Sequence, residues 1–398
     1  MASEQKHQDK FSSVRSKTLW DVPTPALIVD LDRVERNCAR MDKRAAKLGV
    51  TLRPHMKTAK SLEIGRLASR KHGSRITVST VAEVAYFARG GFKDITYAVG
   101  IDASKVPAFA SLQNEYGITV SLITDNVQAV MDAGQRAAAE MANFPIFIEI
   151  DCGGGRGGVL ADSCDLVALA ETIKMLPALK FAGVLTHAGQ SYGAEGVRAI
   201  QAVAEAERAA VVLAASRIRE MGIDVPCVSV GSTPTSIFAA SMAGVTEMRP
   251  GVYTLCDLDQ LALGTCGISD IAVSVLATVL GDNPRSERIL IDAGGLALSK
   301  DLSAAARGST AGFGLVSSIK GSEPLTKLRV AEVHQEHGLI GGAGSHEDHV
   351  AAYPAGSRVR ILPNHACMTA APYDRYYVVR GENIEIIAVW DKASGWKI

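Results

Sequence analysis

The sequence has no excess of charge of either sign. Lysine and arginine together number 42, aspartate and glutamate also number 42, and the formal net charge at pH 7 is zero. Nucleic acids and anionic membranes attract basic protein surfaces, so we expect no nucleic acid as a partner. No uninterrupted apolar stretch is long enough to cross a bilayer, so we expect no membrane either. A small molecule is the expected partner.

The sequence also lacks two features of secreted proteins, a disulfide framework and a signal peptide. The seven cysteines are an odd number, and no two have the close spacing of a zinc knuckle, a redox motif or a secreted disulfide framework. The N-terminal segment MASEQKHQDKFSSVRSK is polar and lacks the apolar core of a signal peptide. These absences favour a cytoplasmic protein. Residues 1–24 are expected to form a flexible tail, or a targeting remnant, and the lead-in to the folded chain.

The periodicity of residues 25–264 predicts the first domain. Short β-branched runs alternate with longer amphipathic stretches, including 33–48 and 197–221, which predicts a parallel sheet with helical crossovers. The number of repeats favours a (β/α)8 TIM barrel over a doubly wound sheet. No Gly-x-Gly-x-x-Gly turn follows the first strand, which argues against a dinucleotide-binding start. The expected strands are 26–29, 50–52, 76–79, 95–98, 119–123, 146–150, 183–185 and 228–230.

After Gly264 the pattern changes. Short alternating segments are separated by turn sequences such as GDNP, GGAGS and RGEN. We therefore expect residues 265–398 to form a mostly antiparallel β-domain, which makes the fold class α/β with an appended β-domain. The expected strands are 271–280, 288–291, 358–362, 376–379 and 384–390.

In a barrel, the functional residues lie where the strands run into the following loops. Lys57, in the segment RPHMKTAK, follows an apolar strand and is flanked by Arg53, His55 and Lys60. Cationic neighbours lower the pKa of a lysine and favour a Schiff base. A solvated lysine among other charges is the plainer interpretation, and this segment alone favours it.

The segment GSTPT has the parts of a phosphate site. Gly231, Ser232 and Thr233 offer backbone N–H groups and hydroxyls at the end of a late barrel strand. Gly251 and Tyr253, in the segment RPGVY, could complete the same site. An ordinary turn between a strand and a helix explains the segment equally well.

Two further residues lie at strand ends. Arg156 is in a glycine run that needs unusual backbone angles, so this loop is expected to be shaped for a ligand. His187 comes just after a strand and could face that ligand. The plain alternatives are a surface arginine and a packed, hydrogen-bonded histidine.

In the second domain, His365 and Cys367 form a candidate metal pair. On an extended strand, alternate residues share a face, and imidazole with thiolate suits Zn²⁺ or a similar metal. Two ligands leave positions open for water and substrate. A buried cysteine beside a hydrogen-bonding histidine is the alternative. The cluster from His346 to His349 is interpreted as a solvated turn in a glycine-bounded loop.

Taken in order, RPHMKTAK, THAGQSY, GSTPT, EMRPGVY, IDAG, QEHG and PNHAC resemble the D-serine dehydratase and D-threonine aldolase family of fold-type III pyridoxal-phosphate enzymes, whose barrel is shared with alanine racemase. The resemblance covers the chain from about residue 25 to its end. It implies that Lys57 carries pyridoxal phosphate, that the GSTPT and RPGVY turns hold the phosphate, and that the protein is a homodimer. It also implies that Arg156 reaches the phenolic oxygen and that Tyr192 or His187 lies beside the ring.

The resemblance further implies a lyase that acts on D-β-hydroxy amino acids, with a divalent metal on His365 and Cys367. Zn²⁺ is expected first, with Mn²⁺, Co²⁺ and Mg²⁺ as alternatives. For β-elimination, Lys57 would remove the α-proton, the metal would help the β-hydroxyl to leave, and His187 is a second catalytic candidate. The products would be a keto acid and ammonia, from D-serine, D-threonine or D-3-hydroxyaspartate.

Two alternatives to elimination remain. The aldolase branch, which yields glycine and an aldehyde, has a His-x-Asp metal pair and a further histidine after the QG turn. Here the pair is His365 and Cys367, and residues 189–192 contain no histidine, so the sequence favours the dehydratase. A non-catalytic pyridoxal-phosphate homeostasis protein shares the barrel, but such proteins lack the β-domain with its His-x-Cys pair.

Overall fold

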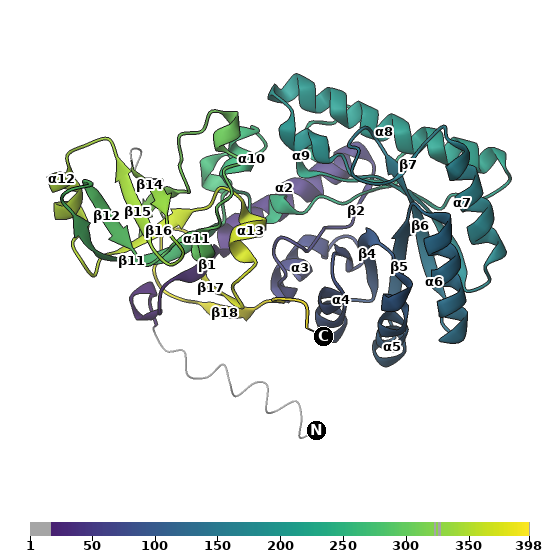
Figure 1. Cartoon of the computed structure of the whole chain (residues 1–398), viewed down its shortest axis with the longest axis horizontal. Coiled ribbons are helices and arrows are strands. Elements are labelled where there is room, and N and C mark those ends of the chain that lie inside the picture. Colours follow the sequence, from purple (N-terminus) through teal and green to yellow (C-terminus); the bar gives the residue numbers. More distant parts are fainter. Residues whose placement is uncertain (1–16, 322–323, 325–327, 398) are drawn as a thin grey trace.

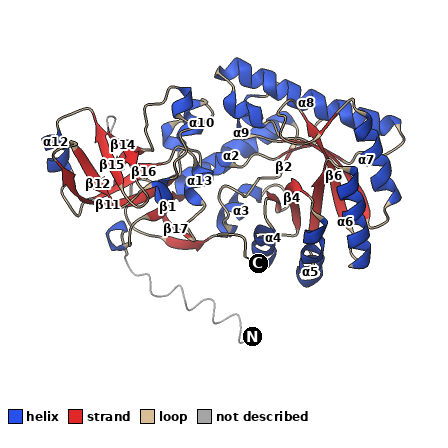
Figure 2. Ribbon diagram, in the orientation of Figure 1, coloured by secondary structure: helices blue, strands red, loops and turns tan. Residues whose placement is uncertain are grey.

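The computed structural model describes residues 17–321, 324 and 328–397, and it contains two domains on either side of helix α2 (Leu31–Leu48) (Figure 1). One domain is a ring of parallel strands surrounded by helices, and the other is built mainly from antiparallel strands (Figure 2). None of the helices in the described ranges is both long and apolar enough to cross a membrane.

The first domain is a (β/α)8 barrel, as predicted. Its eight parallel strands follow the order β2-β10-β9-β8-β6-β5-β4-β3. The ring closes between β2 and β3, where His55 bridges Thr77 and the Met56 N–H donates to the Thr77 carbonyl at 2.8 Å. The strands are β2 (Thr51–Leu52), β3 (Arg75–Val78), β4 (Asp94–Gly100), β5 (Thr119–Thr124), β6 (Phe144–Asp151), β8 (Leu179–Leu185), β9 (Cys227–Val230) and β10 (Glu247–Met248). A short strand, β7 (Val159–Leu160), pairs with β6 outside this ring.

Helices cover the outside of the barrel. They are α3 (Leu62–Ser69), α4 (Val81–Arg89), α5 (Val106–Tyr116), α6 (Val127–Ala139), α7 (Cys164–Met175), α8 (Gly196–Glu220) and α9 (Thr233–Phe238). Helix α2, which precedes β2, packs against α3 and α9 and takes the remaining place in the ring. The helices predicted at 33–48 and 197–221 correspond to α2 and α8, so both predictions are confirmed.

Helix α2 shows how the sequence sets these boundaries. The Asp30 side chain accepts the N–H groups of Asp32 and Arg33 at the N-terminus, and Gly49 ends the helix with a φ of 69°. The buried residues Val34, Cys38, Met41 and Ala45 recur at helical spacing. Their common face packs into the core that lies beneath the barrel strands.

The second domain contains a closed six-stranded antiparallel barrel. Its strands run in the order β11-β12-β15-β14-β13-β16, and β16 pairs again with β11. The strands are β11 (Val273–Asn283), β12 (Arg288–Ile291), β13 (Leu315–Ser318), β14 (Leu328–Val333), β15 (Gly338–Gly342) and β16 (Arg358–Leu362). Beyond β11 the sheet continues through β1 (Ala26–Asp30), β17 (Arg375–Val379) and β18 (Ala388–Asp391).

The expectation that residues 26–29 form the first barrel strand, and hence that the barrel begins at residue 25, is wrong. Strand β1 lies in the β-domain sheet, where Leu27 pairs with Val275 of β11 and Ile28 pairs with Tyr377 of β17. All five residues of β1 are buried. A short apolar run buried on both faces has the same pattern in either sheet, so its sequence does not identify its partners.

The expected N-terminal tail lies partly outside the described residues, which begin at residue 17. The end of the expected lead-in is packed on the β-domain. Leu19 is buried at the start of a 3-10 turn (Leu19–Asp21), and its N–H donates to the carbonyl of Ile384 at 2.9 Å. Strand β1 follows directly from this turn.

Three local expectations in the second domain need correction. The solvated turn expected at His346 is a helix, α12 (His346–Ala352). His365 and Cys367 do not share an extended strand, because His365 caps helix α13 (Ala366–Ala370) and Cys367 lies in its first turn. The strand expected at 384–390 is shorter and starts later, as β18 (Ala388–Asp391). Ser345 accepts the Asp348 N–H at the start of α12, and Asp257 accepts the Ala366 N–H at the start of α13, so polar side chains begin a helix at both places.

Candidate functional site

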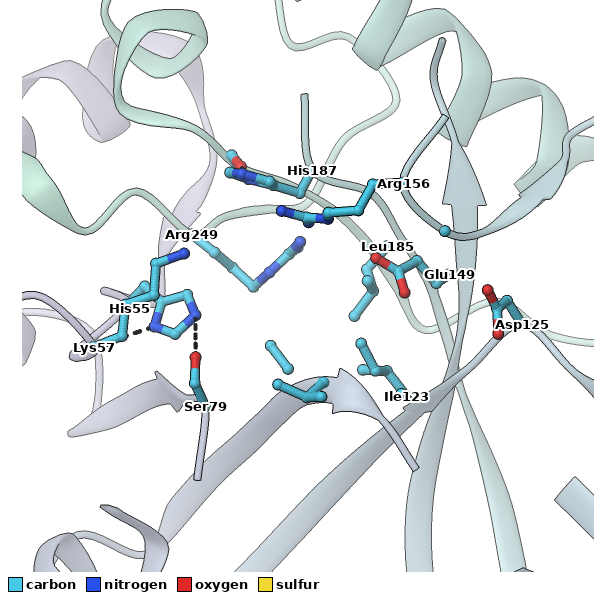
Figure 3. A pocket seen from close by; sticks show the side chains of 15 residues that line it. His55, Lys57, Ser79, Ile123, Asp125, Glu149, Arg156, Leu185, His187 and Arg249 are labelled. Atoms are coloured by element: carbon cyan, nitrogen blue, oxygen red, sulfur yellow. Dashed lines mark hydrogen bonds between the residues drawn. The ribbon is translucent and has the colours of Figure 1, made fainter. Parts of the chain in front are cut away.

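Two adjoining hollows lie at the carboxyl ends of the barrel strands. The first, of about 410 Å³, is in the barrel mouth, and the second, of about 280 Å³, lies between the barrel and the β-domain. Both are lined by His55, Lys57, His187 and Arg249, so they meet at these four side chains. Figure 3 shows the first hollow, with charged and imidazole groups converging on it from several strands.

Within the described part of the chain, Lys57 is the lysine that lines both hollows, and its side chain is exposed. Its neighbours do not provide the unpaired positive charges that the sequence suggested. Arg53 forms ion pairs with Glu247 at 2.7 Å and Asp94 at 2.6 Å, and Lys60 pairs with Glu83 at 3.1 Å. These contacts leave Lys57 as the amine available in the site.

His55 is also not a cationic neighbour of Lys57. Burial, followed by the charge of Lys57, holds the pKa of His55 well below its usual range, so this ring is neutral. Its Nδ1 accepts the Lys57 N–H at 3.3 Å, and its Nε2 lies 3.4 Å from the Ser79 hydroxyl (Figure 3). His55 therefore fixes the backbone of the lysine segment.

His187 lies just past β8 and lines both hollows. Its Nδ1 is hydrogen-bonded to the backbone carbonyl of Gly231, so Nδ1 carries the proton and Nε2 is the free nitrogen. Burial and then the charge of Lys57 lower the pKa of His187 to about 3. The ring is therefore neutral near pH 7. Figure 3 shows it pointing into the same hollow as Arg156.

The loop after β8 is tied to the turn after β9. The hydroxyl oxygens of Ser191 and Ser232 are 2.9 Å apart, and the Thr233 N–H donates to the Tyr192 hydroxyl at 3.4 Å. Ser232 also caps α9 by accepting the Thr235 N–H at 3.1 Å. The predicted residues Tyr192 and Ser232 both line the second hollow, so the structure brings these two segments together at the site.

The glycines of the two turns allow close approaches of the main chain. A Cβ at Gly251 would lie 2.6 Å from the His55 carbonyl oxygen, and one at Gly231 would lie 3.0 Å from the backbone of Arg249. The buried Thr233 hydroxyl has no hydrogen-bond partner among the described residues. Narrow glycine turns with an unused hydroxyl fit the phosphate of pyridoxal phosphate.

The side chain of Tyr253 lies outside the two hollows. Its ring is buried in the hydrophobic core and lines neither hollow. Burial, followed by the charges of Cys38 and Asp42, raises the pKa of Tyr253, and its buried hydroxyl has no hydrogen-bond partner among the described residues. Its side chain is therefore part of the packing beneath the turn, and its backbone alone is near Gly251.

Arg156 lines the first hollow together with Glu149 and Asp125. The Asp151 carboxylate accepts the N–H groups of Gly153 and Gly154 at 2.8 and 2.9 Å. The Asp125 carboxylate accepts that of Gly158 at 2.8 Å. Gly153, Gly155 and Gly158 have positive φ, which confirms that the glycine run needs unusual backbone angles. Burial raises the pKa of Glu149, and the charge of Arg156 opposes that rise.

His365 and Cys367 line the second hollow, as Lys57 does. His365 donates from Nδ1 to Asp301 at 2.6 Å, which directs Nε2 away from this carboxylate. The Cys367 sulfur lies 3.0 Å from the Thr58 hydroxyl. Burial lowers the pKa of His365, but hydrogen bonds and charge from Cys367 and Asp301 raise it to about 10.

These groups fit a divalent metal. An imidazole oriented by a carboxylate, next to a thiol, is a common donor set, and the negative surroundings that attract a proton also attract a metal ion. Across residues 17–321, 324 and 328–397 no group of three or more histidine, cysteine, aspartate or glutamate side chains is arranged to hold a metal. His365 and Cys367 by themselves would leave positions on a metal open for small molecules.

Two residues of the site, Asp257 and Arg249, were not predicted individually, although Arg249 lies in the segment EMRPGVY. Asp257 accepts the N–H groups of Ala366 and Gln260, both at 2.8 Å, and thereby anchors the metal-pair segment to the barrel. Burial raises the pKa of Asp257 to about 7. Arg249 donates to the Thr186 carbonyl at 2.6 Å. These contacts join segments far apart in the sequence, so the two residues are recognised only in the folded protein.

Named proteins and protein families match this chain over nearly its whole length. The family "Alanine racemase, N-terminal domain" matches residues 29–258, and "Putative serine dehydratase domain" matches residues 272–379. The chain is 39% identical to D-threo-3-hydroxyaspartate dehydratase of Delftia sp., over 95% of this chain and 99% of that protein. It is 33% identical to D-serine dehydratase of Dictyostelium discoideum, over 94% and 97%. The solved structure of a cysteine-to-alanine variant of D-threo-3-hydroxyaspartate dehydratase, in the metal-free form, matches with a TM-score of 0.90 and 39% identity, over 96% of this chain and all of that one.

Proposed function

This chain belongs to the D-serine dehydratase and D-threonine aldolase family of fold-type III pyridoxal-phosphate enzymes, and we propose that it is a lyase that eliminates the β-hydroxyl of a D-β-hydroxy amino acid. One observation carries this proposal: Lys57 and the pair His365 and Cys367 line the same hollow. Elimination needs a base at Cα and assistance to the leaving hydroxyl at the neighbouring carbon. The two groups face one volume from opposite domains.

The proposed cofactor residues are Lys57, Arg156 and the turns at 231–233 and 251–252. When bound, pyridoxal phosphate supplies an electron sink for negative charge at Cα. The amine of Lys57 is the group placed to take the α-proton. His187 is proposed to contact the cofactor or substrate through Nε2, because its Nδ1 is committed to Gly231.

The β-domain side of the hollow is proposed to hold the metal. A divalent ion on His365 and Cys367 supplies Lewis-acid assistance to a departing hydroxyl. A nitrogen and a sulfur ligand favour Zn²⁺, with Mn²⁺, Co²⁺ and Mg²⁺ as alternatives. Asp301 orients His365, and Asp257 holds the backbone between the two ligands. The second domain also covers the hollow and so limits the access of water.

Elimination is favoured over retro-aldol cleavage by the loop after β8. Cleavage would need a base at the β-hydroxyl proton. Beyond His187, which is already assigned to contact with the cofactor or substrate, this loop offers Gln190, Ser191 and Tyr192. Burial raises the pKa of Tyr192, and the Ser191 hydroxyl is engaged by Ser232, so neither is a ready base. The alternative activity is that of a D-threonine aldolase.

The test is to supply cofactor- and metal-loaded protein with D-serine, D-threonine and D-threo-3-hydroxyaspartate in turn. Keto acid, ammonia, glycine and aldehyde are assayed in the same reactions. Keto acid and ammonia in equal amounts support elimination and identify the substrate. Formation of glycine and an aldehyde would show that the protein is an aldolase and would contradict elimination. Cofactor binding without any product would favour a non-catalytic pyridoxal-phosphate protein.

We also propose, from the family resemblance, that the protein is a homodimer and, from its polar N-terminal segment and its cysteine pattern, that it is cytoplasmic. Light scattering of the holoprotein after size-exclusion chromatography tests the first proposal, because a dimer has twice the chain mass of 42.0 kDa. A monomeric mass at micromolar concentration would contradict it. Fractionation of the source cells tests the second.

A further inference from the structure

Glu207 is a charged residue without a part in the chemistry described above. It lies on α8, on the face that points toward the barrel, and its side chain is completely buried. Neither hollow is lined by it. A buried carboxylate is costly unless its oxygen atoms are hydrogen-bonded, so its partners indicate why the site contains one.

The partners of Glu207 are the two loops that form the site. Its Oε1 accepts the N–H of Ala188 at 3.0 Å and that of Gly231 at 3.1 Å. Ala188 immediately follows His187, and Gly231 begins the turn proposed to hold the phosphate. One oxygen atom therefore joins the loop after β8 to the turn after β9.

The peptide groups around Gly231 are consequently fixed from two sides. The Gly231 N–H donates to Glu207, while its carbonyl accepts the hydrogen bond of His187. Burial raises the pKa of Glu207, and the nearby Thr235 hydroxyl and the N–H groups of Ala188 and Gly231 oppose that rise. Oε1 accepts both N–H groups, whereas Oε2 has no hydrogen-bond partner among the described residues. Without an acceptor at this position, two backbone N–H groups would be buried without partners.

We propose that Glu207 is a positioning residue for the cofactor site. It holds His187 and the Gly231 turn in one arrangement, and it does so through their backbone without touching the cofactor. Removal of the acceptor should let the two loops move apart, which weakens phosphate binding and misdirects the His187 ring. This inference rests on the proposed function, since it assumes that pyridoxal phosphate binds at these turns.

The test compares Glu207→Ala with Glu207→Gln in pyridoxal-phosphate titrations of cofactor-free protein, with the Tm of each cofactor-free variant measured alongside. The alanine variant should bind the cofactor about tenfold more weakly or worse, because two buried N–H groups lose a charged acceptor. The glutamine variant keeps an amide oxygen for both N–H groups and should stay within about threefold of the parent.

Asp42→Asn is the matched control. Asp42 is also a buried acid on a barrel helix, and its partners, His72 at 3.2 Å and Lys71 at 3.7 Å, lie away from both hollows. Its variant should lower Tm and leave the cofactor affinity unchanged. If Glu207→Ala lowers Tm but binds the cofactor like the parent, Glu207 is merely structural and the inference is wrong.

Glu207→Asp covers the case in which the alanine variant does not fold. It keeps the charge but withdraws the carboxylate by one methylene group from both N–H groups, so cofactor affinity should again fall by severalfold. Parent-like affinity in this variant would also overturn the inference. Failure of the parent protein itself to bind pyridoxal phosphate would instead contradict the proposed function, so the two failures are distinguishable.

Discussion

The Nδ1–H of His187 donates to the carbonyl of Gly231, so the side chain of one barrel loop is held by the main chain of the next. Because a carbonyl only accepts hydrogen bonds, this contact sets the tautomer of the ring. The free Nε2 then has a lone pair and no proton. The two loops cannot move independently without breaking this contact.

His187 should make the stability of the cofactor-free protein depend on pH. The unfolded chain protonates this histidine below pH 6.5, whereas the folded chain does so near pH 3, so the free energy of unfolding falls as the pH falls between these values. From pH 7 to pH 5 the loss is about 2 kcal/mol. In the His187→Asn variant, the free energy of unfolding measured with urea should fall by about 2 kcal/mol less than in the parent over the same pH range. His337→Asn, at an exposed position, is the control, and identical slopes in all three proteins would contradict the prediction.

Lys57→Ala should abolish the covalent attachment of pyridoxal phosphate. Borohydride reduction followed by peptide mapping of the parent protein should place the pyridoxyl group on Lys57. Lys60→Ala is the control and should keep the attachment, because Lys60 is paired with Glu83 at 3.1 Å. A pyridoxyl group on Lys60 would show that the wrong lysine was chosen.

His365→Ala and Cys367→Ala should each lose a bound divalent ion, of which the parent is expected to hold about one per chain. Both variants should keep the absorbance of bound pyridoxal phosphate, because the two ligands lie on the β-domain side of the hollow. Metal analysis and spectroscopy of the same samples check this. Full turnover by thoroughly chelated parent protein would rule out a role for the metal.

Asp301→Asn tests the orientation of His365. The amide still occupies the position 2.6 Å from Nδ1 but no longer supplies a negative charge. Loss of such a partner typically weakens metal binding by about 10- to 100-fold. A competition titration with a chelator measures the affinity. Asp282→Asn, which removes the negative charge 3.1 Å from His346 Nε2, should leave the metal affinity unchanged.

The bond that breaks can be identified with D-threonine. If Lys57 takes the α-proton, the products should be 2-oxobutanoate and ammonia, and an α-deuterated substrate should react more slowly wherever this step limits the rate. The L-enantiomer should be inert, because its α-proton points away from the lysine face. Glycine and acetaldehyde would mean that the loop after β8 was misinterpreted.

The sequence was most informative where neighbours in the chain are also neighbours in the fold. The apolar spacing of α2 and the β-branched runs of the barrel strands identified these elements, and ordered short motifs identified Lys57, His187, His365 and Cys367 as lining residues. Sheet membership of β1 and the contacts of Asp301 and Glu207 were not predictable. They depend on partners that are distant in the sequence, and a single buried carboxylate has no periodic pattern.

The placement of β1 between β11 and β17 also has a consequence for synthesis on the ribosome. Strand β1 is translated first, yet its partner β11 begins only at Val273, and β17 follows at Arg375. At synthesis rates of about 5–20 residues per second, the apolar strand waits on the order of 10–50 s for its first partner. The entire barrel can emerge during that interval. Strand β1 can therefore pair only after the barrel strands have been made, and its pairing with β11 then fastens the segment before the barrel to the β-domain.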